Sequence, residues 1–480
     1  MLLKLLTAFY SGLLLTAQAE TILGVTVFTR HGDRQSKHYS GYGLTALGTQ
    51  QNFQVGGDYR SIYIASNSSK QILGVSENRV VNSQIFATAP DQSVLLNTAT
   101  AFLQGLYPPL EGLDPEITSQ TLNNGSSYGN PLNGYQYVVL HGKEEDAPDT
   151  IWLKGDEGCP VVTKSAKKFQ ESTEFQEKHK STRAFYESFW EEIGSVYDYQ
   201  PSNLTYANAY DIFDLLNVAS IHNASSAGNV TEEELFQLRT LADSAEFGLN
   251  FNNTDPARSI GGQAFAGGIL NQLNQTVSTK GKLKFSLMAG SYDTFLAFFG
   301  ISNLTSTSPN FFGLPHYAAT MSFELFTSEN VTAFPSDNND LRVRFLFRNG
   351  SDDGETLRAF PLFGGSEDSL PWTDFVSQMQ NISITTSEQW CGICQSDMPF
   401  CEAYNSTGSS SPASSQGGSG GGMSNVVAGV IGAMVTLGVV AILVGLAFLF
   451  LRRRRTSHIA PATAQPINEK HSGRSDSDSA

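Results

Sequence analysis

Strand-like and helix-like patterns of apolar residues alternate over two stretches of the chain. Residues 21–28 form an apolar, β-branched run that predicts a buried strand, and the pattern continues as helix, strand, helix to about residue 109. The alternation returns after residue 260, where strands are expected at 283–288, 321–326 and 341–347. We therefore expect an α/β core, built from residues 20–109 and 261–405, whose mostly parallel central sheet is flanked by helices.

The residues between these stretches, 110–260, are predicted to form a helical insertion. A long, charged helical segment is expected at 165–193 and a shorter helix at 206–218. Residues 231–247 have amphipathic spacing, with Thr231 as N-cap and Glu234 three residues later, as in a capping box. Taken alone, these helices are typical of a second helical subdomain.

Both ends of the chain carry patterns typical of membrane targeting. Residues 1–19 have a lysine, an apolar stretch and a small-residue end, and predict a secretory signal peptide. Residues 406–425 are a Ser/Gly-rich linker, and the uncharged run 426–451 is long enough to span a bilayer. Four arginines follow at once, which places the polar tail 452–480 in the cytosol. A removable lipid-anchor signal is the alternative, but such a signal should end with its apolar tail.

Twelve Asn-x-Ser/Thr sequons support this topology, because all of them lie between the predicted signal and the predicted span. They begin at Asn67, Asn124, Asn203, Asn223, Asn229, Asn252, Asn274, Asn303, Asn330, Asn349, Asn381 and Asn405. Their density predicts a glycosylated extracytoplasmic domain. The net charge of −16 does not favour nucleic acid or other polyanions as partners.

Four cysteines in a secreted chain predict two disulfides, with three possible connectivities. They are Cys159, Cys391, Cys394 and Cys401. A Cys394–Cys401 bond would close a short loop and leave Cys159 for Cys391, and we expect this pairing. The Cys-x-x-Cys spacing at 391 and 394 is also found in metal and redox sites, but no second such pair or histidine pair accompanies it.

The motif Arg30-His31-Gly32-Asp33-Arg34 follows the first predicted strand. A histidine in this position can attack phosphorus and carry the phosphoryl group covalently. Arg30 and Arg34 would fork onto the phosphate oxygens, and Gly32 would let backbone N–H groups approach them. The alternative is a surface turn whose arginines form ion pairs.

The motif resembles the R-H-G-x-R-x-P pattern of the histidine acid phosphatases, the phytase-containing branch of the histidine phosphatase superfamily, with Ser36 in place of the proline. Residues 41–63, 102–109, 284–296 and 321–325 resemble further segments of that family. The resemblance implies an α/β core with an inserted helical cap, phosphomonoesters as substrates, His31 as nucleophile and Asp293 as the proton donor to the leaving group.

Two expected site residues are replaced. The family's second histidine falls at Tyr292 and its third phosphate-binding arginine at Gln92, so both changes remove positive charge. Losing one preorganised donor typically costs about 10²–10³ in rate. We therefore expect either a membrane-anchored acid phosphatase of the cell surface or secretory pathway, possessing neither metal nor cofactor, or a catalytically impaired surface protein that binds a ligand. The sequence does not indicate the oligomeric state.

Overall fold

The computed structural model describes residues 20–405, except 114–115, 117, 197, 224–228 and 353. These residues belong to the first of two compact units, Met1–Ser409. The predicted signal peptide (1–19), linker (406–425), membrane span (426–451) and tail (452–480) lie outside the described residues. Within the described ranges, none of the helices combines the length and the apolar character that crossing a bilayer requires.

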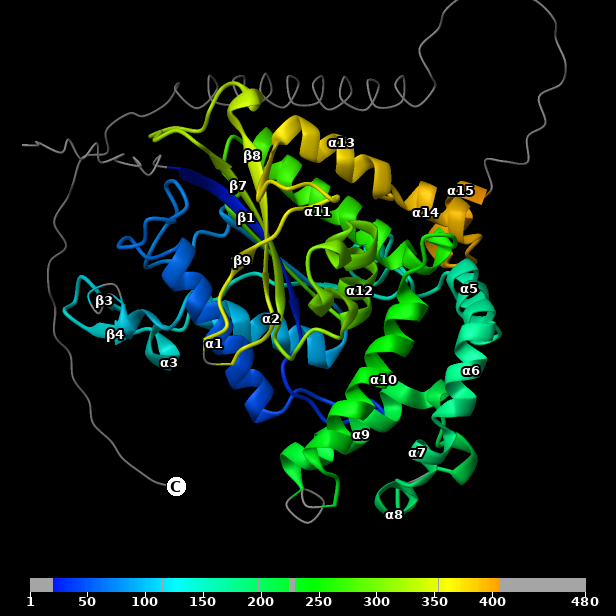
Figure 1. Ribbon diagram of the computed structural model, residues 1–480. Coiled ribbons are helices and arrows are strands. Elements are labelled where there is room, and N and C mark those ends of the chain that lie inside the picture. Colours follow the sequence, from blue (N-terminus) through cyan, green and yellow to red (C-terminus); the bar gives the residue numbers. More distant parts are fainter. Residues whose placement is uncertain are drawn as a thin grey trace, which may run out of the picture. The chain divides into compact units, whose positions relative to one another are not determined.

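An eight-stranded mixed sheet forms the centre of the fold (Figure 1). Its strands are β1 (Thr21–Arg30), β2 (Ile85–Pro90), β5 (His141–Lys143), β6 (Phe285–Gly290), β7 (Thr320–Thr327), β8 (Arg342–Arg348), β9 (Arg358–Ala359) and β10 (Ser369–Pro371). The spatial order is β10-β8-β7-β1-β6-β2-β5, with β9 paired to β8. The β1-β6-β2-β5 half is parallel, and the β7, β8, β9 and β10 pairings are antiparallel. The predicted α/β sheet flanked by helices is confirmed.

Strand β1 lies inside the sheet because its side chains are apolar on both faces. Val25 and Val27 point into the core on one side, and Leu23 and Phe28 into the core on the other. The strand pairs in parallel with β6, where Arg30 lies opposite Gly290, and antiparallel with β7. Its carboxyl end therefore opens at the same edge of the sheet as the carboxyl end of β6.

Helices cover both faces of the sheet. Helices α1 (Ala46–Tyr63) and α2 (Ser93–Leu106) share one core with β1, β2 and β6. On the other face, α11 (Ile260–Ser278), α12 (Tyr292–Ile301) and α13 (Trp372–Ile382) share a second core with β7 and β8 (Figure 1). Further elements are a hairpin of β3 (Ser119–Thr121) and β4 (Ser127–Gly129) and the short helices α3 (Pro131–Gly134) and α4 (Ile151–Lys154).

The insertion contains several short helices and two long ones, and they gather beyond one end of the sheet (Figure 1). They are α5 (Pro160–Gln170), α6 (Thr173–Ser181), α7 (Arg183–Glu187), α8 (Trp190–Ile193), α9 (Ala209–His222) and α10 (Glu232–Asn250). The prediction of a single helix at 165–193 is wrong, because the segment is divided into shorter helices. After α5 ends, Ser172 caps α6 by accepting from the backbone N–H of Phe175. The predicted capping box of Thr231 and Glu234 is confirmed at α10.

The disulfide pairing differs from the one predicted. Cys159 bonds to Cys394, and Cys391 bonds to Cys401. Cys391 and Cys394 lie three residues apart on α14 (Ser387–Cys394), so both face the same side and either could take either partner. Gln395 then adopts a left-handed conformation that turns the chain back, and α15 (Pro399–Asn405) brings Cys401 beside the earlier cysteine.

Candidate active site

The Arg30–Arg34 motif lies where β1 ends, next to the start of α12. Two residues after β6 ends at Gly290, Tyr292 opens α12, and its ring centre is 5.4 Å from the guanidinium carbon of Arg30. Tyr317 also packs against the motif. Its ring centre lies 5.0 Å from the guanidinium carbon of Arg30 and 5.7 Å from the centre of the His31 ring. The fold thus brings together three of the predicted site residues, Arg30, His31 and Tyr292, from segments about 260 residues apart.

His31 is held in the tautomer that a nucleophile needs. Its Nδ1 lies 2.8 Å from the carbonyl oxygen of Gly32, and because a carbonyl only accepts, Nδ1 carries the proton. Burial, and then the charges of Arg30 and Arg34, place the pKa of His31 well below its usual value. The imidazole is therefore neutral with a free electron pair on Nε2. The side chain is 5 % exposed.

Gly32 is required by close packing rather than by a phosphate. A Cβ there would lie 2.3 Å from the carbonyl oxygen of Gly48 in the first turn of α1. The backbone N–H groups of Gly32 and Asp33 donate to the side chains of Asn52 and Gln51, at 2.7 Å each. These N–H groups therefore donate to side chains of α1, whereas we expected them to face a phosphate.

Arg34 is fully engaged by residues of the insertion. Its Nη1 and Nη2 each lie 3.1 Å from an oxygen of Asp214, and they also donate to the Gln35 carbonyl at 2.8 Å and to the Tyr210 hydroxyl at 2.9 Å. Three hydrogen bonds and one further ion contact therefore engage the two Nη atoms. Burial lowers the pKa of Arg34, but Tyr210 and Asp214 outweigh burial and the net shift is upward.

Helix α9 holds the loop after β1 through several polar contacts. Asp214 also accepts from the Ser36 hydroxyl and the backbone N–H of Lys37, at 2.8 Å each. At the two ends of the helix, Asp211 lies 3.2 Å from His38 Nδ1, and His222 Nε2 lies 2.7 Å from Asp33. This arrangement could not be predicted from the sequence, because the partners are 173–189 residues apart and an aspartate in a helix carries no positional signal.

Arg30 keeps part of its guanidinium group open to a ligand. Its Nη1 donates to the carbonyl of Pro315, while Nε has no hydrogen-bond partner among the described residues. The side chain lines a cavity of about 220 Å³ together with Tyr210, Asp214, His316 and Tyr317. His31 is not among the described residues that line this cavity.

Tyr292 and Asp293 face an acidic group. The Tyr292 hydroxyl donates to Glu246 on α10 at 3.1 Å, and its ring packs on Tyr210 with centres 4.6 Å apart. Burial raises the pKa of Glu246 to about 7, and burial together with Asp293 raises that of Asp156 to about 7. One oxygen of Asp293 is buried without a partner among the described residues. Glu246 and Asp156 therefore hold protons under mildly acidic conditions.

Gln92 lies apart from the other predicted site residues. It is exposed, precedes α2, and lines a different cavity with Asp91, Lys143 and Lys154. Strand β2 is separated from β1 by β6, so this side chain lies at the same sheet edge but two strands away.

The histidine phosphatase superfamily (branch 2) matches residues 36–348, about two thirds of the chain. The chain therefore belongs to this superfamily. The matched segment begins just after the Arg30–Arg34 motif, so the motif itself lies outside it.

Two proteins similar in sequence are both lysosomal acid phosphatases. The one from Xenopus laevis is 27 % identical over 391 residues, covering 78 % of this chain and 80 % of the relative. The one from Pongo abelii is 23 % identical over 396 residues, covering 78 % and 81 %. The solved phytase from Citrobacter braakii is similar in fold, with a TM-score of 0.51 at 13 % identity over 76 % of this chain and 98 % of that one.

Proposed function

We propose that this protein hydrolyses phosphate monoesters through a phosphohistidine at His31. The observation that carries the proposal is the state of that side chain: it is neutral, its Nδ1 proton is fixed by the Gly32 carbonyl, and Nε2 keeps its electron pair beside Arg30. Membership of the histidine phosphatase superfamily and similarity to acid phosphatases support the same reaction.

The reaction has two steps. Nε2 of His31 attacks phosphorus, the ester P–O bond breaks, and Asp293 gives a proton to the leaving oxygen. Water then attacks the phosphohistidine, the P–N bond breaks, phosphate leaves and Asp293 regains a proton. Arg30 neutralises the phosphate oxygens in both steps. The neighbouring carboxyl groups of Asp156 and Glu246 support an acidic optimum, because burial raises the pKa of each to about 7.

Trapping of the phosphoenzyme tests this mechanism. The purified full-length protein is mixed with a ³²P-labelled aryl phosphate at pH 5, quenched and analysed for acid-labile label. We expect label and turnover in the wild type and in His141→Ala, an exposed histidine on β5, and neither in His31→Ala. Turnover by His31→Ala with its fold intact would refute the mechanism.

The second candidate is a catalytically impaired protein that binds a ligand. Two observations favour it. Arg34 is already paired with the carboxylate of Asp214, and the hydroxyl of Tyr292 donates its hydrogen bond to Glu246. Absence of turnover on any phosphate monoester, together with measurable phosphate binding that Arg30→Gln abolishes, would select this candidate.

Residues 110–260 include β5, which belongs to the central sheet. We therefore propose that only the helices α5 to α10 of this range act as a cap over the site. We also propose that residues 426–451 anchor the protein in a secretory-pathway or lysosomal membrane, with its catalytic unit extracytoplasmic. The contacts of α9 with the loop after β1 support the cap. Similarity to two lysosomal acid phosphatases supports a lysosomal or secretory-pathway location, and the membrane anchor rests on the sequence pattern alone. Glycosidase treatment and protease protection in sealed vesicles test the topology. A tail protected inside the lumen would overturn it.

A further inference from the structure

A second, larger hollow adjoins the cavity at Arg30. This cleft has a volume of about 980 Å³ and lies between α9, α10 and residues 309–316. It shares Phe213, Asn217, Arg239, Leu314 and His316 with the 220 Å³ cavity, so the two lie side by side. A phosphate held at Arg30 would thus have its ester group directed toward the cleft.

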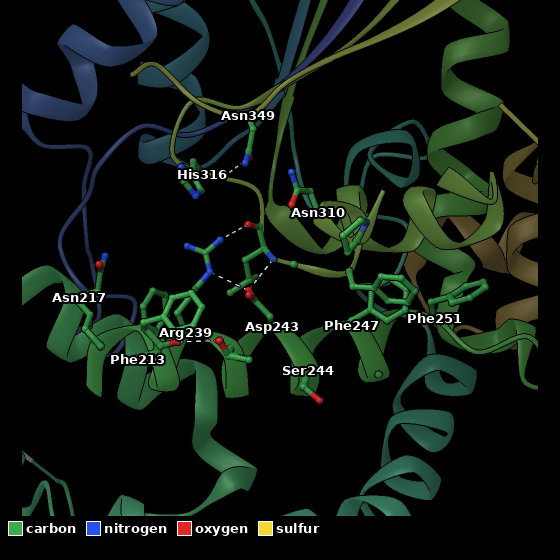
Figure 2. A pocket seen from close by; sticks show the side chains of 18 of the residues that line it. Phe213, Asn217, Arg239, Asp243, Ser244, Phe247, Phe251, Asn310, His316 and Asn349 are labelled. Carbon is green, nitrogen blue, oxygen red and sulfur yellow. Dashed lines mark hydrogen bonds and ion pairs between the residues drawn. The ribbon is translucent and has the colours of Figure 1, made fainter. Parts of the chain in front are cut away.

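The cleft is polar at one end and aromatic at the other. Figure 2 shows Arg239, Asn217 and His316 near one end, with Phe247 and Phe251 at the far end. Its phenylalanines are Phe169, Phe213, Phe236, Phe247, Phe251 and Phe312. Phe236 and Phe312 are 73 % and 47 % exposed, which is costly for aromatic side chains unless something covers them.

The charges of the cleft do not suit a polyanion. Each of its two arginines has an acidic partner: Arg239 lies 2.9 Å from Asp243, and Arg258 lies 3.8 Å from Asp255. Glu174 and Glu232 add negative charge to the lining. Burial, and then Arg239, lower the pKa of His316, so this side chain adds no charge near neutral pH.

Arg239 lies where the two hollows meet. Its Nε contacts Asp243 and its Nη2 donates to the carbonyl of Leu314, which holds the guanidinium in place (Figure 2). Nη1 takes part in neither contact, so it can bind a phosphate or ester oxygen at the mouth of the cavity.

We propose that the cleft binds the alcohol part of the substrate, and that this alcohol is large and apolar and carries a single phosphate. The inference rests on the proposed phosphatase function and defines the substrate class of that site. The phosphate would lie at Arg30 and Arg239, and the apolar group along Phe247, Phe251 and Phe312. A polyphosphorylated polyol would bring several anionic groups against phenylalanines and carboxylates.

Alkyl phosphates of increasing length test the proposal, because the reacting group stays the same. We measure kcat/KM of the full-length protein for ethyl, butyl, hexyl and octyl phosphate, and for inositol hexakisphosphate. A buried methylene contributes about fourfold in affinity, and half of that effect in an open cleft gives about twofold. We therefore expect an increase on the order of 50-fold from ethyl to octyl phosphate, with the inositol ester no better than ethyl phosphate.

The double variant Phe236→Ser, Phe312→Ser should lower the octyl-to-ethyl ratio by about tenfold or more, without loss of folding because both side chains are exposed. The control is Tyr128→Ser, since Tyr128 is an aromatic residue of β4 that is 64 % exposed and lines neither hollow. It should leave the ratio unchanged.

Two failures are distinguishable. Hydrolysis of all four alkyl esters with equal kcat/KM would overturn the cleft proposal and leave the phosphatase proposal standing. If no ester is hydrolysed, calorimetric binding of the same series decides: affinity that rises with chain length in the wild type and not in the double variant supports the cleft, and equal affinities overturn it.

Discussion

Removing the carboxylate of Asp214 should destabilise the protein and increase its affinity for phosphate at the same time. Asp214 and Arg34 are 3 % and 1 % exposed, and two contacts of 3.1 Å join them. Breaking such a buried pair typically costs about 3–5 kcal/mol, because the remaining charge has no partner. We therefore expect Asp214→Asn to lower the free energy of unfolding by about 3 kcal/mol or more.

A double-mutant cycle separates the pair from its surroundings. Asp214→Asn, Arg34→Met and the double variant are compared by denaturant unfolding of the full-length protein, followed by tryptophan fluorescence. We expect the double variant to cost little more than one single variant, with a coupling energy of about 2–3 kcal/mol. The control is Glu187→Gln, which removes an exposed ion pair with Arg183 at 2.7 Å and should cost about 0.5 kcal/mol or less.

The same variant tests the charge of the site. Without the carboxylate, two Nη hydrogens of Arg34 become available to an anion. A hydrogen bond to a charged group contributes about 1.5–3 kcal/mol, so the inhibition constant of inorganic phosphate should fall about tenfold or more. Additive single effects in the cycle, or phosphate inhibition unchanged in Asp214→Asn, would refute the reasoning that Asp214 neutralises Arg34.

Three further predictions concern the acidic group and the disulfides. Tyr292→His should raise kcat by about 10²-fold, since it restores one transition-state donor beside Arg30; an unchanged kcat in steady-state assays would contradict this. Glu246→Gln should raise the free energy of unfolding by roughly 3 kcal/mol at pH 8 and leave it unchanged at pH 4. Burial raises the pKa of Glu246 from 4.5 to about 7, so the cost of ionising this buried carboxyl grows as the pH rises from 4.5 to 7. Denaturant unfolding at both pH values measures it, and a difference that grows toward acid would show the opposite sign. Replacing both cysteines of the Cys159 disulfide should cost about 3 kcal/mol more than replacing those of the Cys391 disulfide, because the loops span 235 and 10 residues; equal losses in thermal unfolding would argue against it.

The features that could be predicted from the sequence are those with local signals. The apolar run before Arg30 predicted β1, and the spacing of Thr231 and Glu234 predicted the start of α10. The resemblance placed Tyr292 beside the motif, and parallel pairing of β1 with β6 brings them together.

What the sequence did not predict depends on contacts between distant segments. Nothing around Asp214 indicates that it would meet Arg34, which lies 180 residues earlier. The broken helix at Ser172 and the exchanged partners of Cys391 and Cys394 have the same origin, because several local choices were compatible with the pattern and packing selected one. Gln92 was placed by resemblance alone, and the turn before α2 leaves it exposed.

The position of β1 in the sheet has a consequence for biosynthesis. Nine of its ten residues are buried, yet its neighbours β6 and β7 are about 260 and 300 residues further along the chain. At about 5–20 residues per second, synthesis of β6 follows after roughly 13–50 seconds. During that time an apolar strand with two open edges is available for aggregation, and this hazard lasts until the second half of the sheet emerges.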